Sequence, residues 1–285
     1  MGNYILITNY NNIDDLNKAV DNCIDIISKS DYKLNEDIKI ITVSNYGYEN
    51  KNSFHHIISD GNHYIAGLEF IKNYDNNPIV MFLDSDDVIL DGKLEIFKED
   101  FNKYGYISNY LKQSNNGKLI KFHDGIISSG STINAKYYNL NFLNKFGING
   151  SDYIFYLYTI ENGIKIKQIE KCFNIYTVNP NSITHRDPVQ YNRNIIKLLN
   201  YALTQFKNKK VTKKIKKRIL EMELRVKYDT HAKLTIVDII KYTKVYNLNL
   251  REDIISTVKM VILLLPYKYR IKLYPLSKFR RVKNW

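Results

Sequence analysis

The sequence predicts an α/β protein in which a mainly parallel, Rossmann-like sheet is followed by a helical extension. Three observations lead to this prediction. Short β-rich runs alternate with amphipathic segments through the first half of the chain. One apolar run, Ile79 to Leu83, has no polar face, as expected of a strand buried on both sides. From Tyr191 onward, apolar residues recur at helical spacing. We therefore expect one α/β domain over residues 1–185 and a helical region over residues 186–285.

The elements follow in order along the chain. Strands are expected at Tyr4 to Thr8, Ile38 to Val43 and Ile79 to Leu83, with helices at Ile13 to Ser30 and Asn62 to Asn73 between them. Beyond these, the patterns predict a helix at Asp91 to Tyr104, a hairpin of Tyr106 to Leu111 with Lys118 to His123, a helix near Leu140 to Phe146, and strands at Ile164 to Ile169 and Cys172 to Val178. Strands that alternate with helices indicate right-handed βαβ units.

The apolar run of the third strand ends at three carboxylates, Asp84, Asp86 and Asp87. Carboxylates this close repel one another unless a positive charge lies among them. In open α/β sheets, ligands bind outside the carboxyl ends of the strands, and Mg²⁺ or Mn²⁺ binds there through one or two carboxylates and the phosphates of a substrate. The stretch predicts a site for a metal and a diphosphate. The alternative is a solvated turn in which an Asp caps the following helix.

Composition excludes several classes of protein. With 285 residues, 44% of them hydrophobic, the chain has ample material for a core. Its two cysteines, Cys23 and Cys172, lie in no metal-binding spacing and predict no disulfide, which favours a reducing cytoplasm. The amino terminus has no basic region and predicts no signal peptide. The longest apolar run, Val258 to Leu265, is far shorter than the roughly 20 residues that span a bilayer.

The net charge of +13 is unevenly distributed. Residues 186–285 contain 25 Lys and Arg against 7 Asp and Glu, so the excess of positive charge belongs to this region. The basic segment Lys207 to Arg218 predicts a solvated face or an anionic partner. An apolar stripe from Ile254 to Leu265 is followed by clustered cations, which suits a helix on an anionic membrane surface. Packing of the stripe on the α/β domain is the alternative.

The segment from Phe82 to Asp87, Phe-Leu-Asp-Ser-Asp-Asp, resembles the Asp-x-Asp motif of family-2 glycosyltransferases of the GT-A fold, the type that builds bacterial capsules, lipopolysaccharide and other cell-surface glycans. The resemblance covers roughly the first two thirds of the chain. It implies a nucleotide-diphospho-sugar transferase with Mn²⁺ or Mg²⁺ as cofactor. Asp84 would contact the donor ribose and the metal, Ser85 the donor, and Asp86 the metal.

The resemblance further implies that the enzyme transfers a sugar from a nucleotide-sugar donor to a hydroxyl of a glycan or lipid-linked acceptor. The transfer would invert the anomeric carbon, and a UDP-sugar is the favoured donor. Such an enzyme would be cytoplasmic and peripheral at the inner face of the cell membrane.

Two further turns are similar to the donor site of this family. The turn Thr8-Asn9-Tyr10-Asn11 is similar to a Thr-Tyr-Asn turn that lies against the nucleotide, which implies donor contacts for Thr8, Asn9 and Tyr10. The second strand usually ends in Asp-Asp-Gly-Ser and holds the base, whereas this chain has Ser-Asn-Tyr-Gly, with Asn45 in this region. The departure leaves the identity of the base open.

The acceptor side has weaker signals. Asp152 occupies the Asp position of a Glu-Asp pair at a helix start, with Ser151 where Glu is commoner. The resemblance implies that Asp152 acts as general base on the acceptor hydroxyl, although an Asp there is also an ordinary cap. Tyr176 to Thr184 resembles the segment that ends the catalytic domain in many relatives. His185 follows it as a candidate metal ligand, with an exposed loop histidine as the alternative.

A competing hypothesis is a nucleic-acid-binding protein that uses the basic helical region. It explains the positive charge but leaves the acidic cluster without a role, so we expect no nucleic-acid partner. The chain contains neither Gly-x-Gly-x-x-Gly nor a P-loop motif, so dinucleotide-binding and P-loop hypotheses find no support.

Overall fold

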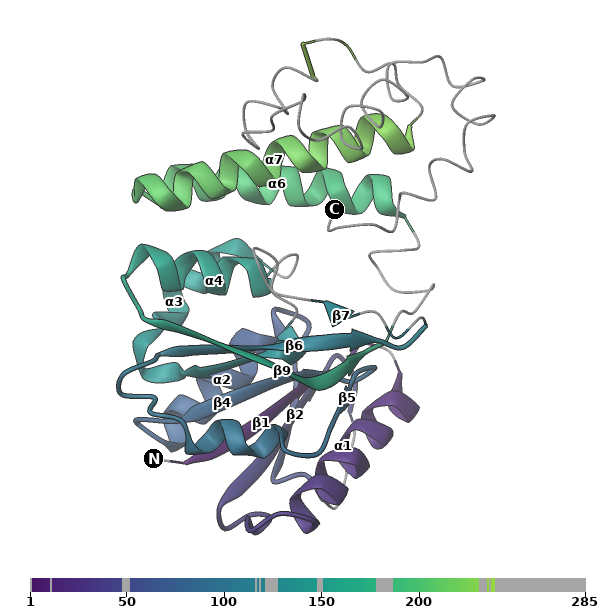
Figure 1. Ribbon diagram of the computed structural model, residues 1–285, viewed down its shortest axis with the longest axis vertical. Coiled ribbons are helices and arrows are strands. Elements are labelled where there is room, and N and C mark those ends of the chain that lie inside the picture. The colour runs from purple at the N-terminus through teal and green to yellow at the C-terminus, as the bar shows by residue number, and fades with distance from the viewer. Residues whose placement is uncertain are drawn as a thin grey trace. The chain divides into compact units, whose positions relative to one another are not determined.

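The structure is a computed structural model that describes residues 2–10, 12–47, 52–115, 117, 119–120, 128–147, 151–177, 187–230, 235 and 237–238. The chain divides into two units, residues 1–179 and 180–285. The first unit contains one sheet with helices on its faces, and the second contains two long helices (Figure 1). His185 and the apolar stripe from Ile254 to Leu265 lie outside the described residues.

The sheet of the first unit combines a parallel and an antiparallel part. In the parallel part, β3 (His55–Ile58), β2 (Ile38–Ser44), β1 (Asn3–Thr8) and β4 (Ile79–Asp84) are neighbours in that order. The order continues through β8 (Ser131–Asn134), β6 (Tyr106–Gln113), β9 (Ile166–Tyr176) and β5 (Val88–Ile89), while β7 (Leu119–Ile120) pairs with β6. The α/β fold class and the three strands expected in the parallel part are confirmed; β3, β5 and β8 were not predicted.

Helices cover the two faces of the sheet according to the alternation of side chains along each strand. Helix α1 (Ile13–Ser28), capped by Asn12, packs its apolar side on one face, among residues such as Ile5 and Met81. Helix α2 (His63–Tyr74), capped by Asn62, and helix α4 (Ser151–Glu161) lie on the other face, where both contact Phe82. The short helix α3 (Leu140–Leu143) continues into η4 (Asn144–Phe146), as predicted.

Two elements differ from the sequence prediction. The helix expected over Asp91 to Tyr104 is only the 3₁₀ helix η1 (Lys93–Lys98), because Gly92 before it has a left-handed backbone (φ 81°) and Glu99 after it is extended. The two strands expected after Ile164 form the single strand β9, whose pairing with β6 shifts register at an irregularity. Both differences depend on contacts with distant strands, which local sequence patterns do not show.

A glycine inside α2 allows this helix to approach β1 closely. A Cβ on Gly67 would lie 3.1 Å from the Leu6 Cγ and closer still to both of its methyl groups, and Leu6 is fully buried. We expect Gly67→Ala to lower the free energy of unfolding by about 1–2 kcal/mol, because overpacking outweighs the roughly 1 kcal/mol gain in helix propensity. Urea unfolding measures this change. A more stable Gly67→Ala protein would contradict the close approach, and Ala66→Gly in the same helix controls for propensity alone.

In the second unit, the residues that the structure describes form a pair of long helices. Helix α6 (Pro188–Gln205) begins at an Asp187 cap with a proline in its first turn, and α7 (Lys209–Asp229) follows after a short connection. The buried side chains of the pair include Ile195, Leu199, Ala202, Val211, Ile215 and Met222. Among the helices that the structure describes, none combines the length and the apolar character needed to cross a bilayer.

Candidate active site

The register of the parallel strands brings three loops together at one edge of the sheet. Thr8, the last residue of β1, is level with Asp84 at the end of β4 and with Val43 near the end of β2. The segments that follow β1, β2 and β4 therefore leave the sheet side by side. This edge is where open α/β sheets bind ligands, and it contains most of the residues that the sequence singled out.

The Asp84 carboxylate is fixed by hydroxyl groups from three parts of the chain. Thr8 Oγ1 donates to Asp84 Oδ1 at 3.0 Å, the Tyr64 hydroxyl donates to the same oxygen, and the Ser128 hydroxyl donates to Oδ2. The Asp84 main-chain N–H donates to Ser129 Oγ at 2.9 Å. Burial, followed by the negative charge of Asp84, raises the pKa of Tyr64 well above its usual range, so Tyr64 remains a donor. The carboxylate is held in one orientation.

The other two carboxylates have different surroundings. Asp86 is half-buried, and burial together with the charge of Asp84 raises its pKa to about 6. Asp87 is 2% exposed, and its Oδ1 accepts from the Thr177 N–H at the end of β9 at 2.8 Å. Its Oδ2 is buried with no hydrogen-bond partner. Burial and the neighbouring Asp84 raise the pKa of Asp87 well above its usual range.

Asn9 connects the three loops. It is 1% exposed, its Nδ2 donates to Ser85 Oγ and to the Asn12 main-chain oxygen, and its Oδ1 accepts from the Tyr46 hydroxyl at 2.6 Å. Tyr46 follows β2, and Ser85 follows β4. Asn9 and Ser85 therefore tie the loops of β1, β2 and β4 to one another, a role that the sequence did not indicate.

Tyr10 and Asn45 lie at the same edge. Tyr10 is 39% exposed, and its ring stacks on His63 of α2 with centroids 3.9 Å apart. Burial of the hydroxyl and the charge of Asp84 raise the pKa of Tyr10 to about 12, so the ring is neutral. His63 is fully buried and its pKa is lowered by burial. Asn45 follows β2 and is half-buried.

Asp152 lies in the first turn of α4, which packs on the strand that ends in Asp84. Phe155, one turn further along α4, contacts Phe82 with ring centroids 5.7 Å apart. The pKa of Tyr106 is raised well above its usual range, mainly by burial and also by the nearby charge of Asp152. The Tyr106 hydroxyl forms a hydrogen bond with Ser131 Oγ. Ser131 is two residues after Ser129, whose hydroxyl accepts from the Asp84 N–H. These contacts place the start of α4 on the face of the sheet that carries Phe82.

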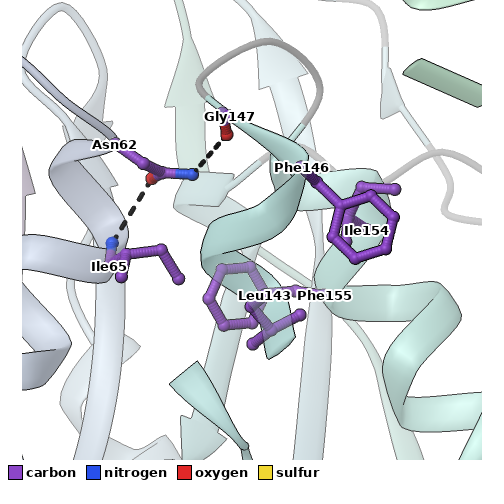
Figure 2. Close-up of a pocket in the computed structure, with 7 residues that line it drawn as sticks. All are labelled: Asn62, Ile65, Leu143, Phe146, Gly147, Ile154 and Phe155. Atoms are coloured by element: carbon purple, nitrogen blue, oxygen red, sulfur yellow. Dashed lines mark hydrogen bonds between the residues drawn. The ribbon is translucent and has the colours of Figure 1, made fainter. Parts of the chain in front are cut away.

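A small recess, too tight to hold a water molecule, lies beside the start of α4 (Figure 2). Asn62 caps α2 with its Oδ1, while its Nδ2 donates to the Gly147 main-chain oxygen at 2.8 Å. The remaining lining is apolar: Ile65, Leu143, Phe146, Ile154 and Phe155. The hydrogen bond anchors the chain four residues before Ser151, where α4 begins, to the end of α2.

Within the described ranges, no group of three or more His, Cys, Asp or Glu side chains is arranged to hold a metal ion. The turn at the end of β4 nevertheless concentrates three carboxyl groups, Asp84, Asp86 and Asp87, and Oδ2 of Asp87 has no hydrogen-bond partner. A cation would relieve this concentration. The donor set suits Mg²⁺ or Mn²⁺ held by one or two carboxylates and completed by phosphate oxygens, more than a cage built from protein alone.

A buried lysine, which no local sequence pattern indicated, lies close to this edge. Lys93 is fully buried, and burial lowers its pKa to about 7. Its Nζ donates to Asn109 Oδ1 at 2.5 Å and to the Ser129 main-chain oxygen at 3.2 Å. A neutral amine has two hydrogens, which match these two acceptors.

As the pH is raised from 7 to 9, we expect the free energy of unfolding of the wild type to rise by more than that of Lys93→Met. The unfolded lysine keeps its proton up to its usual pKa of 10.5, whereas the folded one loses it near 7. The unfolded state therefore binds more protons over this window, and stability rises with pH by at most about 1.4 kcal/mol per pH unit. Urea unfolding of both proteins at pH 7, 8 and 9 measures the difference. Parallel pH dependences would contradict the lowered pKa.

No family model and no curated protein sequence matches the chain. Solved structures do match it. Staphylococcus aureus TarS, residues 1–349, in complex with UDP-GlcNAc, superposes with a TM-score of 0.57 at 12% identity, over 98% of this chain and 88% of TarS. The chain has the GT-A fold of family-2-like glycosyltransferases.

A second GT-A structure gives a weaker match. This structure is the mannosyltransferase PcManGT from Pyrobaculum calidifontis in complex with GDP-Man and Mn²⁺. It superposes with a TM-score of 0.50 at 10% identity, and the match covers 96% of this chain and 84% of the PcManGT chain. At these identities the likeness establishes the fold, including the GT-A architecture expected from the Asp-x-Asp motif.

Proposed function

We propose that this protein is a metal-dependent, inverting glycosyltransferase. It transfers a sugar from a nucleotide-sugar donor, with a UDP-sugar favoured, to a hydroxyl of a glycan or lipid-linked glycan in cell-surface polysaccharide synthesis. The observation that carries the proposal is the group of carboxylates at the end of β4, at the ligand-binding edge of a GT-A fold. TarS was crystallised with UDP-GlcNAc and PcManGT with GDP-Man and Mn²⁺, which supports a nucleotide-sugar donor.

The donor is proposed to lie along the loops after β1, β2 and β4. The exposed ring of Tyr10, held by its stack on His63, offers a flat surface to a nucleobase. Asn45 follows β2 directly at this edge and is the proposed contact to the base. Thr8 orients Asp84 through its hydroxyl, and Asp84 faces the ribose. Asn9 and Ser85 act by fixing the loops that carry these residues.

The metal would be held by Asp86 and Asp84, with His185 as a further candidate ligand. A bound Mn²⁺ or Mg²⁺ supplies positive charge to the diphosphate leaving group. Asp86 is suited to this role because it is half-buried beside the negative charge of Asp84. Burial and that charge together raise its pKa to about 6, and a metal ion would offset the charge. Asp84 adds a second carboxylate in a fixed orientation.

Asp152 is proposed as the general base. In an inverting transfer, one carboxylate removes the proton from the acceptor hydroxyl while the hydroxyl attacks the anomeric carbon from the side opposite the leaving diphosphate. Asp152 belongs to a different element from the donor carboxylates, so the two roles are separate. Asp152 is half-buried, and its Oδ1 accepts from the Tyr153 main-chain N–H at 2.7 Å.

A calorimetric titration tests the function. The protein is titrated with UDP, GDP and CMP, each with and without Mn²⁺. Binding of one nucleotide that depends on Mn²⁺ is the expected result, and the identity of that nucleotide names the donor class. If no nucleotide binds while an oligonucleotide does, in a salt-dependent way, the basic region is the functional element and the proposal fails.

The basic region is proposed to hold the enzyme at the anionic inner face of the cell membrane. The first ten residues of α7, from Lys209 to Arg218, include seven Lys and Arg and no acidic residue. Attraction to anionic lipids is worth about 1 kcal/mol for each Lys or Arg near the surface. Truncation after residue 250 removes nine further Lys and Arg and two acidic residues, so we expect it to weaken binding to vesicles that contain anionic lipid, measured by co-sedimentation. Unchanged binding would indicate that residues 251–285 have a structural role instead.

A further inference from the structure

A lysine lies fully buried behind the turn that holds Asp84, and the proposed reaction does not use it. Lys93 is the first residue of η1. Lysine is almost never fully buried unless it is paired, yet the hydrogen bonds described for its Nζ end on two neutral oxygens, Asn109 Oδ1 of β6 and the main-chain oxygen of Ser129. A core position that needed only volume would be filled better by an apolar side chain.

The contact with Ser129 leads directly to the donor site. Ser129 belongs to η2 (Ser128–Gly130), a turn of three buried residues. The Ser128 hydroxyl donates to Asp84 Oδ2, and the Ser129 hydroxyl accepts from the Asp84 N–H. One short turn is thus bonded to Lys93 on one side and to the Asp84 carboxylate and main chain on the other.

The contact with Asn109 joins Lys93 to the rest of the sheet. Asn109 is fully buried, and its Nδ2 donates to Asn174 Oδ1 of β9 at 3.1 Å. Lys93 therefore links η1, β6 and η2 through polar groups inside the core. In a low-dielectric interior such a network holds its members in one arrangement, and the loss of one member leaves the others without partners.

We infer that Lys93 is a positioning residue for the donor and metal site, which acts through the Ser128–Ser129 turn to fix the Asp84 carboxylate. This inference rests on the proposed function. The amine suits the task in either protonation state, because the neutral form keeps two hydrogens for its two acceptors. Lys93 would touch neither donor nor metal.

The test measures the affinity of the protein for the nucleoside diphosphate that the wild type binds in the presence of Mn²⁺. Calorimetry compares the wild type, Lys93→Met, Ser128→Ala and the double variant, with thermal unfolding recorded for each. Lys93→Met keeps the length of the side chain and removes both hydrogen bonds. We expect it to weaken Mn²⁺-dependent binding roughly 10-fold to 100-fold, as removal of an outer partner of a metal site typically does. Lys98→Met, on the exposed side of the same 3₁₀ helix, is the matched control and should bind as the wild type does.

The double variant separates positioning from a general effect on the fold. If Lys93 acts through the turn, the affinity of the double variant equals that of whichever single variant binds the nucleotide more weakly. Both substitutions then remove the same support of the Asp84 carboxylate, so their effects do not add. Additive losses, or unchanged affinity in Lys93→Met, would overturn the inference and leave the proposed function standing. If the wild type binds no nucleotide with Mn²⁺, both fail. If Lys93→Met does not fold, Lys93→Gln, which keeps an amide donor, replaces it in the same cycle.

Discussion

Replacing Asp86 by Asn is expected to abolish Mn²⁺-dependent nucleotide binding and sugar transfer. Asn keeps the size of the side chain but removes the charge that would hold the metal on the diphosphate. A metal at a leaving group is worth several kcal/mol of transition-state stabilisation, so transfer should fall roughly a thousandfold or more. Calorimetry with the nucleotide and Mn²⁺ measures binding, and release of nucleotide from the sugar donor measures transfer.

The same substitution should stabilise the metal-free protein. The pKa of Asp86 is raised to about 6 in the folded state, so the folded state binds more protons than the unfolded state between about pH 4 and pH 6, and stability falls as the pH rises through this window. Above pH 6 the ionised carboxylate costs about 1–3 kcal/mol, which Asp86→Asn removes. Asp21→Asn, on the exposed side of α1, is the control. Full activity of Asp86→Asn would refute the metal assignment, and lower stability at neutral pH would refute the raised pKa.

Replacing Asp152 by Asn is expected to stop transfer and to spare donor binding. The amide has the shape of the carboxylate but cannot accept a proton, and loss of a general base lowers a rate by roughly 10²–10⁴. Calorimetry should give the same nucleotide affinity as the wild type, because Asp152 belongs to α4 and not to the loops after β1, β2 and β4. Nucleotide release should show the loss.

Two outcomes would contradict this role. Loss of nucleotide binding in Asp152→Asn would indicate that Asp152 contributes to donor binding and is not the general base. An unchanged rate would leave it as a helix cap, which is the ordinary role of an Asp in this position. Glu161→Gln, at the other end of α4, controls for the loss of a negative charge on the same helix.

The local sequence was sufficient for elements whose signal lies within a few residues. The apolar run that becomes β4 is buried on both faces, so burial is visible in composition alone, and the carboxylates at its end are adjacent in the chain. The spacing of apolar residues in α1 likewise follows from one buried face. Asp152 could be placed at a helix start by its neighbours. These predictions needed no knowledge of what the segment packs against.

The tertiary structure alone decided how the carboxylates are held. Asp84 receives hydroxyl groups from Tyr64 and Ser128, which are 20 and 44 residues away along the chain. Lys93 was expected on an ordinary helix from Asp91 to Tyr104, whereas it is a fully buried residue whose partners belong to β6 and η2.

The α/β class, the parallel strands and the acidic edge could be predicted from local patterns, because hydrophobic periodicity and adjacent charges are properties of a short segment. The side chains that orient that edge, the short η1 and the unbroken β9 could not be predicted in this way. Each of these depends on pairing between segments far apart in the chain, where the partner sets burial, hydrogen bonding and pKa. A local pattern contains no information about that partner.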